Sequence, residues 1–572
     1  MKKIDFLKAI AYIYILIPLI IFIFGWTKLY ITGVPLTLAI VICLARMIKR
    51  LRPDSIAFQL RDAWKVIIAL ILLLAWVYYS GIGGYSWQNT DHLWRNQIFQ
   101  LLVDYDWPVI KGTASGPRGM SYYIGFWMLP AFIGNKYGIE AGFMAQYIWA
   151  IVGLVLVYGF LCRRLNKIVL WPLILLIFFS GMDVLGWLVY NFKGFTELKL
   201  GSQFELWLPG YQFSSFTTQL FWVFNQAVYA WLITLLLLIE KNDSIVLIMA
   251  AGVLSAPLPM VGLFPIALCI IYKNSKDIAQ AKGSGFFKAF FYSMFTYENV
   301  VGLICTIVLA MLFGGNGAIQ YTGDINNAQL SPKKIVAIII AGIVGLTAVV
   351  LLLRILTKKI RAYRVNHSWR VYTPKIIKNI ALVWHRIVYV LSSHKLIVYT
   401  VLLVVWLAFL AIHGAVVGTQ NEATQNNNVL KYVLFLIIEI GAFIAFTIKD
   451  NKDDIIYICA LIVLLVCPIV IIGAGTDFCM RACIPAQMVL FLAMIDAIIK
   501  AFQDKRKPLI IAILVVLAIG SVTPANEFIR TIQNRETFEE EDKTLARKEQ
   551  IFESMNFSTD ANTNLFYKYL AK

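Results

Sequence analysis

The chain has 572 residues, of which 60% are hydrophobic, and its mean hydropathy is +0.74. Apolar runs of about 20 residues, the length that crosses a bilayer, recur along it. This excludes a soluble globular protein and predicts an all-α polytopic membrane protein. The net charge of +19 is assigned to cytoplasmic loops and not to nucleic-acid binding. The eight cysteines lie mostly inside apolar runs and show no zinc-binding spacing.

The apolar runs predict about 13 spans, and the first is retained because no small-residue cleavage pattern follows it. The predicted spans cover residues 7–25, 31–45, 66–82, 141–161, 168–189, 219–239, 298–314, 334–353, 396–414, 429–448, 455–472, 483–500 and 508–524. Two further segments are interpreted as non-crossing. Residues 120–134 are short and contain Pro130, which favours an interfacial or re-entrant helix. Residues 244–272 are broken by SAPLPMVGLFP and are interpreted as two half-helices that enter and leave on one side.

Four basic clusters orient this arrangement, at residues 46–65, 163–167, 354–395 and 500–507. With the two segments above treated as non-crossing, all four fall on the face of the N-terminus, which the positive-inside rule makes cytoplasmic. The sequence therefore predicts a multi-pass protein of the plasma or inner membrane. Residues 1–524 form the transmembrane domain, and residues 525–572 form a short, charged, helical tail outside the cell.

The outer loop formed by residues 83–120 is too polar to lie in hydrocarbon, and it contains Asp91 and His92. The amphipathic run from Leu93 to Tyr105 predicts a helix that lies flat at the interface with its apolar face in lipid. An acid at the membrane boundary beside a basic loop favours chemistry on a lipid-borne substrate. The alternative is an ordinary polar loop with an interfacial helix.

Three more charged residues lie at a membrane edge or inside a span. Asp477 and Arg481 are four residues apart and so share one face of a helix. They form either a helix start, with the acid at the positive end of the dipole, or an anion site, since a buried arginine needs an anion such as a lipid phosphate. Asp183 lies in the outer half of its span, where an acid is either functional or hydrogen-bonded to a neighbouring helix.

The sequence contains no nucleotide-binding motif, which argues against an ATP-driven pump. No cluster of His, Asp and Glu predicts a metal site, so no cofactor is assigned and dependence on a divalent metal stays open.

The stretch 66–165 resembles the opening of GT-C glycosyltransferases, in particular the lipid A aminoarabinose transferases and the protein mannosyltransferases. The matching positions are Asp91-His92, Asp106-Trp107, Arg118 and Tyr122-Tyr123. FSGMD, FSSFTTQLFWVFNQ and DFCMR look like segments of uncharacterised bacterial membrane proteins grouped with that superfamily. The chain departs from the pattern in two extra leading spans, in His92 where an acid is usual, and in lacking a large outer domain.

The resemblance implies a GT-C-like bundle with a catalytic first outer loop. Such an enzyme moves a sugar from a polyprenyl-phosphate donor to a glycan or lipid acceptor of the cell envelope. Asp91 would be the general base on the acceptor hydroxyl, and His92 would orient it or bind the sugar. The leaving phosphate needs fixed positive charge. The residues implied for substrate binding are Arg118 and Arg481, with Lys111 as a weaker phosphate ligand, and Asp106, Asp477, Tyr122 and Tyr123.

Two other classes of function use the same features. A transporter or flippase of a lipid-linked glycan would use the broken helices and Asp183, although no inverted repeat is visible. A non-catalytic partner of an envelope-glycan complex would use the outer loops as a docking surface. In each case the expected partners are a lipid-linked sugar and membrane lipids.

Overall fold

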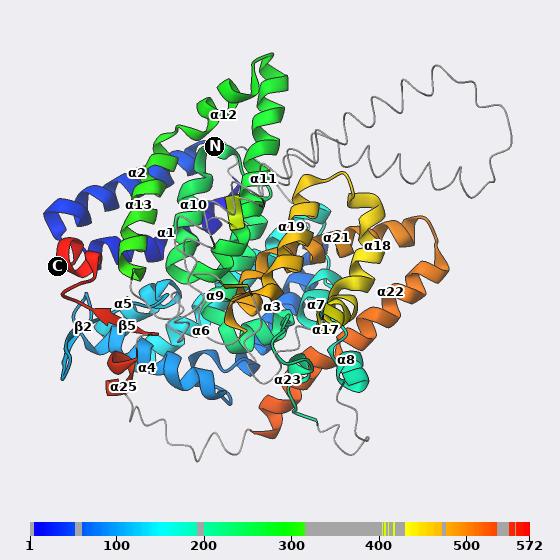
Figure 1. The fold of residues 1–572 in the computed structure, drawn as a ribbon, viewed down its shortest axis with the longest axis horizontal. Coiled ribbons are helices and arrows are strands. Elements are labelled where there is room, and N and C mark those ends of the chain that lie inside the picture. The colour runs from blue at the N-terminus through cyan, green and yellow to red at the C-terminus, as the bar shows by residue number, and fades with distance from the viewer. Residues whose placement is uncertain are drawn as a thin grey trace. The chain divides into compact units, whose positions relative to one another are not determined.

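The structure is a computed structural model of the chain (Figure 1). It describes residues 5–51, 60–190, 200–314, 429–471, 476–534, 548–554 and 556–572, with isolated positions between 403 and 417. All elements discussed below belong to one compact unit, residues 1–321 and 417–572.

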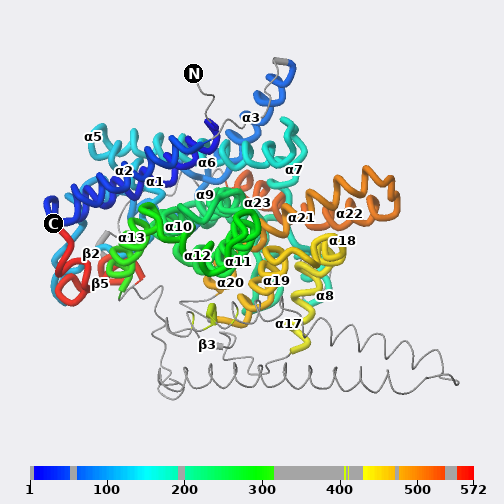
Figure 2. The backbone as a smooth tube through the Cα atoms, turned by 90° about the horizontal axis from the view of Figure 1, so that it is seen from above, coloured from blue at the N-terminus to red at the C-terminus, as the bar shows by residue number. Residues whose placement is uncertain are grey.

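Helix α9 (Phe216–Leu237) forms the centre of this unit (Figure 2). Nearly all of its side chains are buried, as expected for a helix that is hydrophobic on every side. The helices that contact it include α6 (Ile139–Leu165), α10 (Ile245–Ser255), α11 (Pro257–Lys282), α21 (Ile484–Gln503) and α23 (Val522–Gln533).

Within the described residues, nine helical stretches are long and apolar enough to cross a membrane. A tenth is added if the bent pair α12 (Phe286–Met294) and α13 (Tyr297–Phe313) is one span. The nine are α1 (Phe6–Trp26), Leu29–Lys49, α6, Trp171–Tyr190, α9, α11, Val429–Asn451, α21 and Lys507–Gln533. The prediction of an all-α polytopic membrane protein is therefore confirmed in its coarse form. The predicted spans 334–353 and 396–414 lie outside the described residues.

Two predicted spans fall below the length of a full span. Helix α3 (Ala63–Tyr79) has the predicted length but begins three residues earlier, and α19 (Ile455–Val466) ends before the predicted boundary at residue 472. A third, Trp171–Tyr190, is interrupted, since α7 (Trp171–Phe178) ends four residues before α8 (Asp183–Tyr190) begins.

Residues 244–272 form two helices, as predicted, but the second is longer than expected. Helix α11 runs to Lys282 and is long enough to span by itself. The two ends of the pair nevertheless lie side by side. The Asn242 side-chain amide donates to Ser275 Oγ (2.9 Å), and that of Asn274 donates to the Glu240 carbonyl (3.0 Å).

Basic residues gather at one end of the unit. Arg46 and Arg50, at the end of α2 (Val34–Lys49), form ion pairs with Glu298 at 2.8 and 2.7 Å, and Arg163 pairs with Asp5. Further ion pairs at this end join Lys8 to Glu240, Arg50 to Asp243, Arg164 to Asp496 and Lys500 to Asp450. Three of the four predicted basic clusters therefore meet at one end of the bundle, while the fourth, 354–395, lies outside the described residues.

The predicted outer loop, residues 83–120, folds as a helix and two strands of a small sheet. Helix α4 (Thr90–Asp104) matches the predicted amphipathic helix, but its apolar side chains Ile98, Leu101 and Leu102 are buried against protein, including α5 (Met128–Tyr137). The expectation that this face lies in lipid is therefore wrong. Strands β1 (Ile110–Thr113) and β2 (Gly116–Met120) follow, so the fold is not purely helical.

The predicted helical tail is helical only in part. Residues 525–533 continue α23, and α25 (Lys548–Glu553) is a short helix. The end of the chain instead adds β5 (Ser558–Asp560) to β2 as a third antiparallel strand. The last residues return to the end of α1, where the Lys28 amide donates to the Leu570 carbonyl at 2.7 Å.

Candidate active site

One pocket collects five of the residues predicted to act on substrate. It holds about 530 Å³ of empty space, counting the part open to solvent. Its lining comes from α4, the stretch after β2, α20 (Asp477–Ala482) and the stretch before β5. The lining residues are Asp91, Trp94, Arg95, Tyr122, Tyr123, Asp477, Arg481, Asn556 and Phe557.

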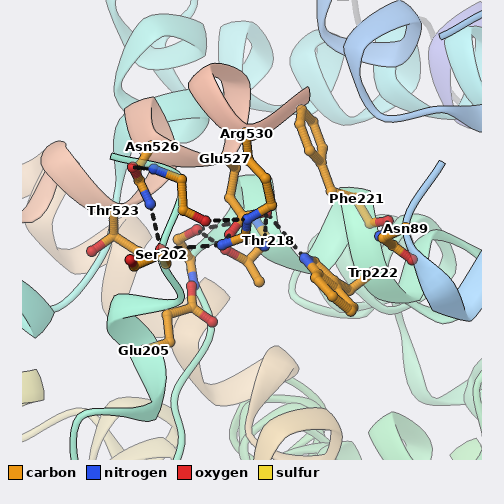
Figure 3. A network of polar contacts seen from close by, with 12 residues as sticks. Asn89, Ser202, Glu205, Thr218, Phe221, Trp222, Thr523, Asn526, Glu527 and Arg530 are labelled. Carbon is orange, nitrogen blue, oxygen red and sulfur yellow. Dashed lines mark hydrogen bonds and ion pairs between the residues drawn. The ribbon is translucent and has the colours of Figure 1, made fainter. Parts of the chain in front are cut away.

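Asp91 is positioned by the start of α4. The Asn89 side chain caps this helix by accepting a hydrogen bond from the Asp91 amide (3.0 Å), and its own amide group donates to the Phe221 carbonyl on α9 (2.9 Å; Figure 3). The acid thus lies in the first helical turn, where a negative charge is favoured by the helix dipole. Its side chain is 42% exposed and accepts a hydrogen bond from Arg95 Nη2 at 2.9 Å.

Arg95 is almost fully buried, with 4% of its surface exposed. Asp91 satisfies Nη2, and the guanidinium lies 5.7 Å from the centre of the Phe224 ring. Nε and Nη1 have no hydrogen-bond partner. A buried guanidinium with unused donors is costly unless an anion completes its contacts.

Arg481 is a second buried cation in the same pocket. It forms an ion pair with Asp477 at 3.0 Å and donates from Nη1 to the Tyr123 hydroxyl at 2.9 Å, while Nε has no partner. Burial disfavours its charge, but the nearby Asp477 carboxylate outweighs this and keeps its pKa above the ordinary value. Both interpretations of the Asp477–Arg481 pair are thus compatible with the geometry: the two residues form a helix start, and Arg481 keeps one donor unused.

Aromatic rings form the remaining walls. The rings of Tyr122 and Tyr123 are in contact, tilted by 31° with centres 3.7 Å apart, and burial raises the pKa of Tyr122 well above its ordinary value. Phe557, just before β5, contacts Trp94 and Tyr122 with centres 5.5 and 5.1 Å apart. The C-terminal segment therefore closes one side of a pocket whose other walls come from α4, the stretch after β2 and α20.

Four predicted residues are not among the lining side chains. His92 points away from the pocket toward α9, with Nε2 3.1 Å from the Phe221 carbonyl and its ring stacked on Phe224. Burial, reinforced by the Arg95 charge, lowers the pKa of His92 to about 3, so the ring is neutral. Asp106 is exposed beyond the end of α4. Lys111 and Arg118 face each other across β1 and β2, and Arg118 donates to Ser558 Oγ at 2.8 Å.

Sequence reasoning missed Arg95, Trp94, Asn556 and Phe557. Arg95 had a signal, because it lies four residues after Asp91 and so shares its face of the helix. Asn556 and Phe557 had none, since only the pairing of β5 with β2 brings the C-terminal segment to α4.

No group of three or more His, Cys, Asp or Glu side chains in the described part of the chain is arranged to hold a metal ion. The pocket offers only two carboxylates, Asp91 and Asp477, and each of them is already paired with an arginine.

A second polar network adjoins the pocket and holds α23 against α9. Arg530 pairs with Glu527 at 2.9 Å, and Glu527 also accepts a hydrogen bond from Trp222 Nε1 (Figure 3). Glu205 accepts a hydrogen bond from the Ser215 amide, and burial, with the charges of Asp183 and Glu527, raises its pKa to about 8.

Glu205 is connected to the pocket through one side chain. Gln212 donates to Glu205 at 3.3 Å, and its amide oxygen accepts a hydrogen bond from the Thr476 hydroxyl at 3.0 Å, directly before α20. The network therefore supports the helix that carries Asp477 and Arg481.

No protein-family model, no curated protein and no solved structure matches this chain.

Proposed function

We propose that the protein is a membrane glycosyltransferase of the GT-C type, which moves a sugar from a polyprenyl-phosphate donor to a glycan or lipid acceptor on the extracytoplasmic face. One observation supports this most: the pocket combines the partly exposed carboxylate of Asp91 with the buried guanidinium groups of Arg95 and Arg481. Both cations keep nitrogens without a partner, as a site for an anionic group would.

The chemistry divides between these groups. The acceptor oxygen attacks the anomeric carbon of the sugar while the bond from that carbon to the phosphate oxygen breaks. The hydroxyl proton goes to Asp91, and the phosphate leaves with the bonding electron pair. Arg95 and Arg481 stabilise the charge that develops on it. In this proposal Arg95 has the phosphate-binding role that the family resemblance implied for Arg118, which does not line the pocket.

The aromatic walls suit the rest of the donor. Trp94 and Phe557 present stacked rings beside the charged groups, and such rings pack against the apolar face of a sugar or the first isoprene unit. Asp477 and Tyr123 hold Arg481 in place, so they act on the donor through that side chain.

The test is turnover of a polyprenyl-phosphate sugar by purified Asp91→Asn, beside donor binding by the same sample. The substitution keeps the size of the side chain but removes its basicity. We expect transfer to slow by roughly 10²–10⁴-fold, with donor binding retained. Asp106→Asn is the matched control, because this exposed acid lies outside the pocket and should leave turnover within about twofold of the parent. Parent-rate turnover by folded Asp91→Asn would exclude Asp91 as the base.

A flippase for the same lipid-linked substrate is the second candidate. The observation in its favour is the interrupted span Trp171–Tyr190, which carries a buried acid at its break. In sealed vesicles, a flippase changes the side of the membrane on which the labelled lipid lies without forming a glycosylated product. A transferase forms product from donor already on the outer side.

A further inference from the structure

The interruption of the span Trp171–Tyr190 faces an irregular turn in another candidate span. Residues 179–182 connect α7 to α8 without helical structure. Opposite them, Ile437–Gly441 form a π-helical turn with Glu439 at its middle. The Met182 amide points to the Ile438 carbonyl at 3.4 Å. Broken helices and π-turns inside spans are found most often where a site is built.

Two carboxyl groups meet at this point. Asp183 is fully buried, and its Oδ2 accepts hydrogen bonds from the hydroxyls of Ser180 (2.8 Å) and Thr523 (2.9 Å). Glu439 is 2% exposed, and its Oε1 accepts a hydrogen bond from Trp207 Nε1 at 2.7 Å. The predicted hydrogen bond from Asp183 to a neighbouring helix is therefore present, but it uses only one of the two oxygens.

The two remaining oxygens, Asp183 Oδ1 and Glu439 Oε2, are buried and have no hydrogen-bond donor in the described part of the chain, and the two carboxyl groups are close enough to interact electrostatically. Ionised carboxylates only accept hydrogen bonds, so a bond between two carboxyl groups requires a proton on one of them. Gly181 makes the approach possible, because a Cβ at this position would overlap Glu439 Oε2.

No described basic group neutralises the pair, since no ion pair among the described residues includes Asp183 or Glu439. The groups that face it from other elements are acidic or already paired. Glu205 is a third buried carboxyl group, whose pKa of about 8 leaves it mostly protonated at neutral pH, Cys479 is a buried thiol, and Glu527 is paired with Arg530. Two adjacent buried carboxylates without a cation cannot both be ionised at acceptable cost.

A small pocket lies beside the pair, with about 330 Å³ of empty space including its mouth. Ser180, Ser214, Gln487 and Glu439 supply its polar lining, and phenylalanines supply much of the rest. A hard metal ion takes six or more oxygen ligands, which this lining does not offer. A proton needs only the two carboxyl oxygens.

We propose that Asp183 and Glu439 form a proton-binding site inside the membrane-spanning part, in which the two carboxyl groups share one proton. While the proton is bound, the broken span Trp171–Tyr190 packs against the span Val429–Asn451. Loss of the proton leaves two negatively charged carboxylates in contact, and their repulsion separates the two spans. None of the side chains involved lines the pocket of Asp91, so the site does not depend on the proposed transferase activity.

Infrared difference spectroscopy on the full-length protein in lipid nanodiscs tests the proposal directly. At neutral pH we expect the stretching band of a protonated carboxyl group, which shifts in heavy water and disappears at alkaline pH. Glu205, with its pKa of about 8, would give a similar band, so parent and variants are compared in a Glu205→Gln background, in which the double variant Asp183→Asn/Glu439→Gln should lack this band. Asp496→Asn, which removes an exposed acid paired with Arg164, should keep it unchanged.

Thermal unfolding supplies a second measurement. The unfolding temperature of the parent should fall as the pH rises through the range in which the band disappears. The double variant, whose amides cannot ionise, should show a smaller fall.

A parent spectrum without the band at neutral pH overturns the proposal, as does a band that persists in the double variant. Stoichiometric binding of radioactive sodium that the double variant loses would also overturn it, because the site would then hold Na⁺ in place of a proton. If the double variant does not fold, the presence or absence of the band in the parent spectrum still tests whether a protonated carboxyl group is present.

Discussion

Arg95 contacts the candidate base, Asp91, and is also a candidate ligand for the donor phosphate. Through Nη2 it holds the Asp91 carboxylate, and its other nitrogens remain without acceptors. Arg481 repeats this arrangement with Asp477 and Tyr123. Each guanidinium is thus oriented by an acid of its own helix, and its charge is partly neutralised by that acid, which allows two fixed cations in one buried site.

Lysine in place of either arginine should weaken donor binding. Arg95→Lys and Arg481→Lys keep the charge but lose the planar fork that binds two oxygens. A hydrogen bond to a charged group contributes about 1.5–3 kcal/mol, so we expect roughly 10–100-fold weaker binding of polyprenyl phosphate, and a larger loss in Arg481→Ala. Titration of the lipid into purified protein measures this. Arg164→Lys, at the opposite end of the unit, serves as control, and unchanged affinity in Arg481→Ala would make Asp477–Arg481 a purely structural pair.

His92 should make the protein sensitive to acid. The unfolded chain protonates this histidine as pH falls through about 6.5, whereas the folded protein does so only at a pKa of about 3. Between these values the unfolded state binds more protons, so stability falls on acidification, by up to about 1.4 kcal/mol per pH unit for one group. We expect His92→Gln, whose amide still donates to the Phe221 carbonyl, to flatten this slope in thermal unfolding between pH 7 and 5. An unchanged slope would contradict the assignment.

At the scale of elements, the C-terminal segment completes both the sheet and the pocket. Pairing of β5 with β2 places Asn556 and Phe557 at the pocket, and Tyr567 packs on the bare backbone of Gly119 while its hydroxyl donates to the Met120 carbonyl at 2.5 Å. The segment is held by contacts on both sides of β5, so disturbing one of them should loosen the closure.

Gly119→Ala is predicted to detach this segment, because the added methyl group overlaps the ring of Tyr567. Overpacking of this kind costs about 1–3 kcal/mol. We expect faster proteolysis and faster hydrogen exchange in residues 556–572, together with reduced turnover. Gly112→Ala is a matched control on the neighbouring strand, where a Cβ meets nothing within 4 Å. Equal protection of the segment in both variants would show that it is held elsewhere.

At the scale of the whole unit, the basic residues and the pocket lie at opposite ends of α21. This helix begins at Ile484, next to α20, and reaches Lys500 in the basic cluster, and its 20 residues extend about 30 Å. With a membrane between these ends, the positive-inside rule predicts that the ion-paired basic end lies in the cytoplasm and the pocket outside.

Cysteine labelling tests this orientation, and the eight native cysteines are all buried, which keeps the background low. A cysteine at Ser115, in the exposed turn between β1 and β2, should react with an impermeant reagent in intact cells. Cysteines at Ser55 and Ser368 should react only after permeabilisation. Labelling of the cysteine at position 368 in intact cells would contradict the predicted orientation in the membrane.

Much of the fold follows from local sequence. Apolar runs long enough to cross a bilayer predict most of the long helices from hydropathy alone. The amphipathic run in the polar loop predicts α4, and the acid at its start identifies Asp91 as a candidate site residue. The break of 244–272 was predictable because prolines interrupt an apolar run there. The length of α11 was not, since its last turns leave the apolar stretch and are held by contacts to Asn242.

What the tertiary structure alone decided is which distant side chains meet. The C-terminal strand reaches α4 across more than 400 residues, and Glu439 reaches Asp183 across more than 250. A single sequence records the residue types and their local periodicity, but a contact between distant segments leaves no local pattern. The sequence by itself therefore determined a polytopic helical protein with an acid in the polar loop that follows the third apolar run. The packing of the helices decided that Asp91 shares a pocket with two buried arginines and that His92 faces the core.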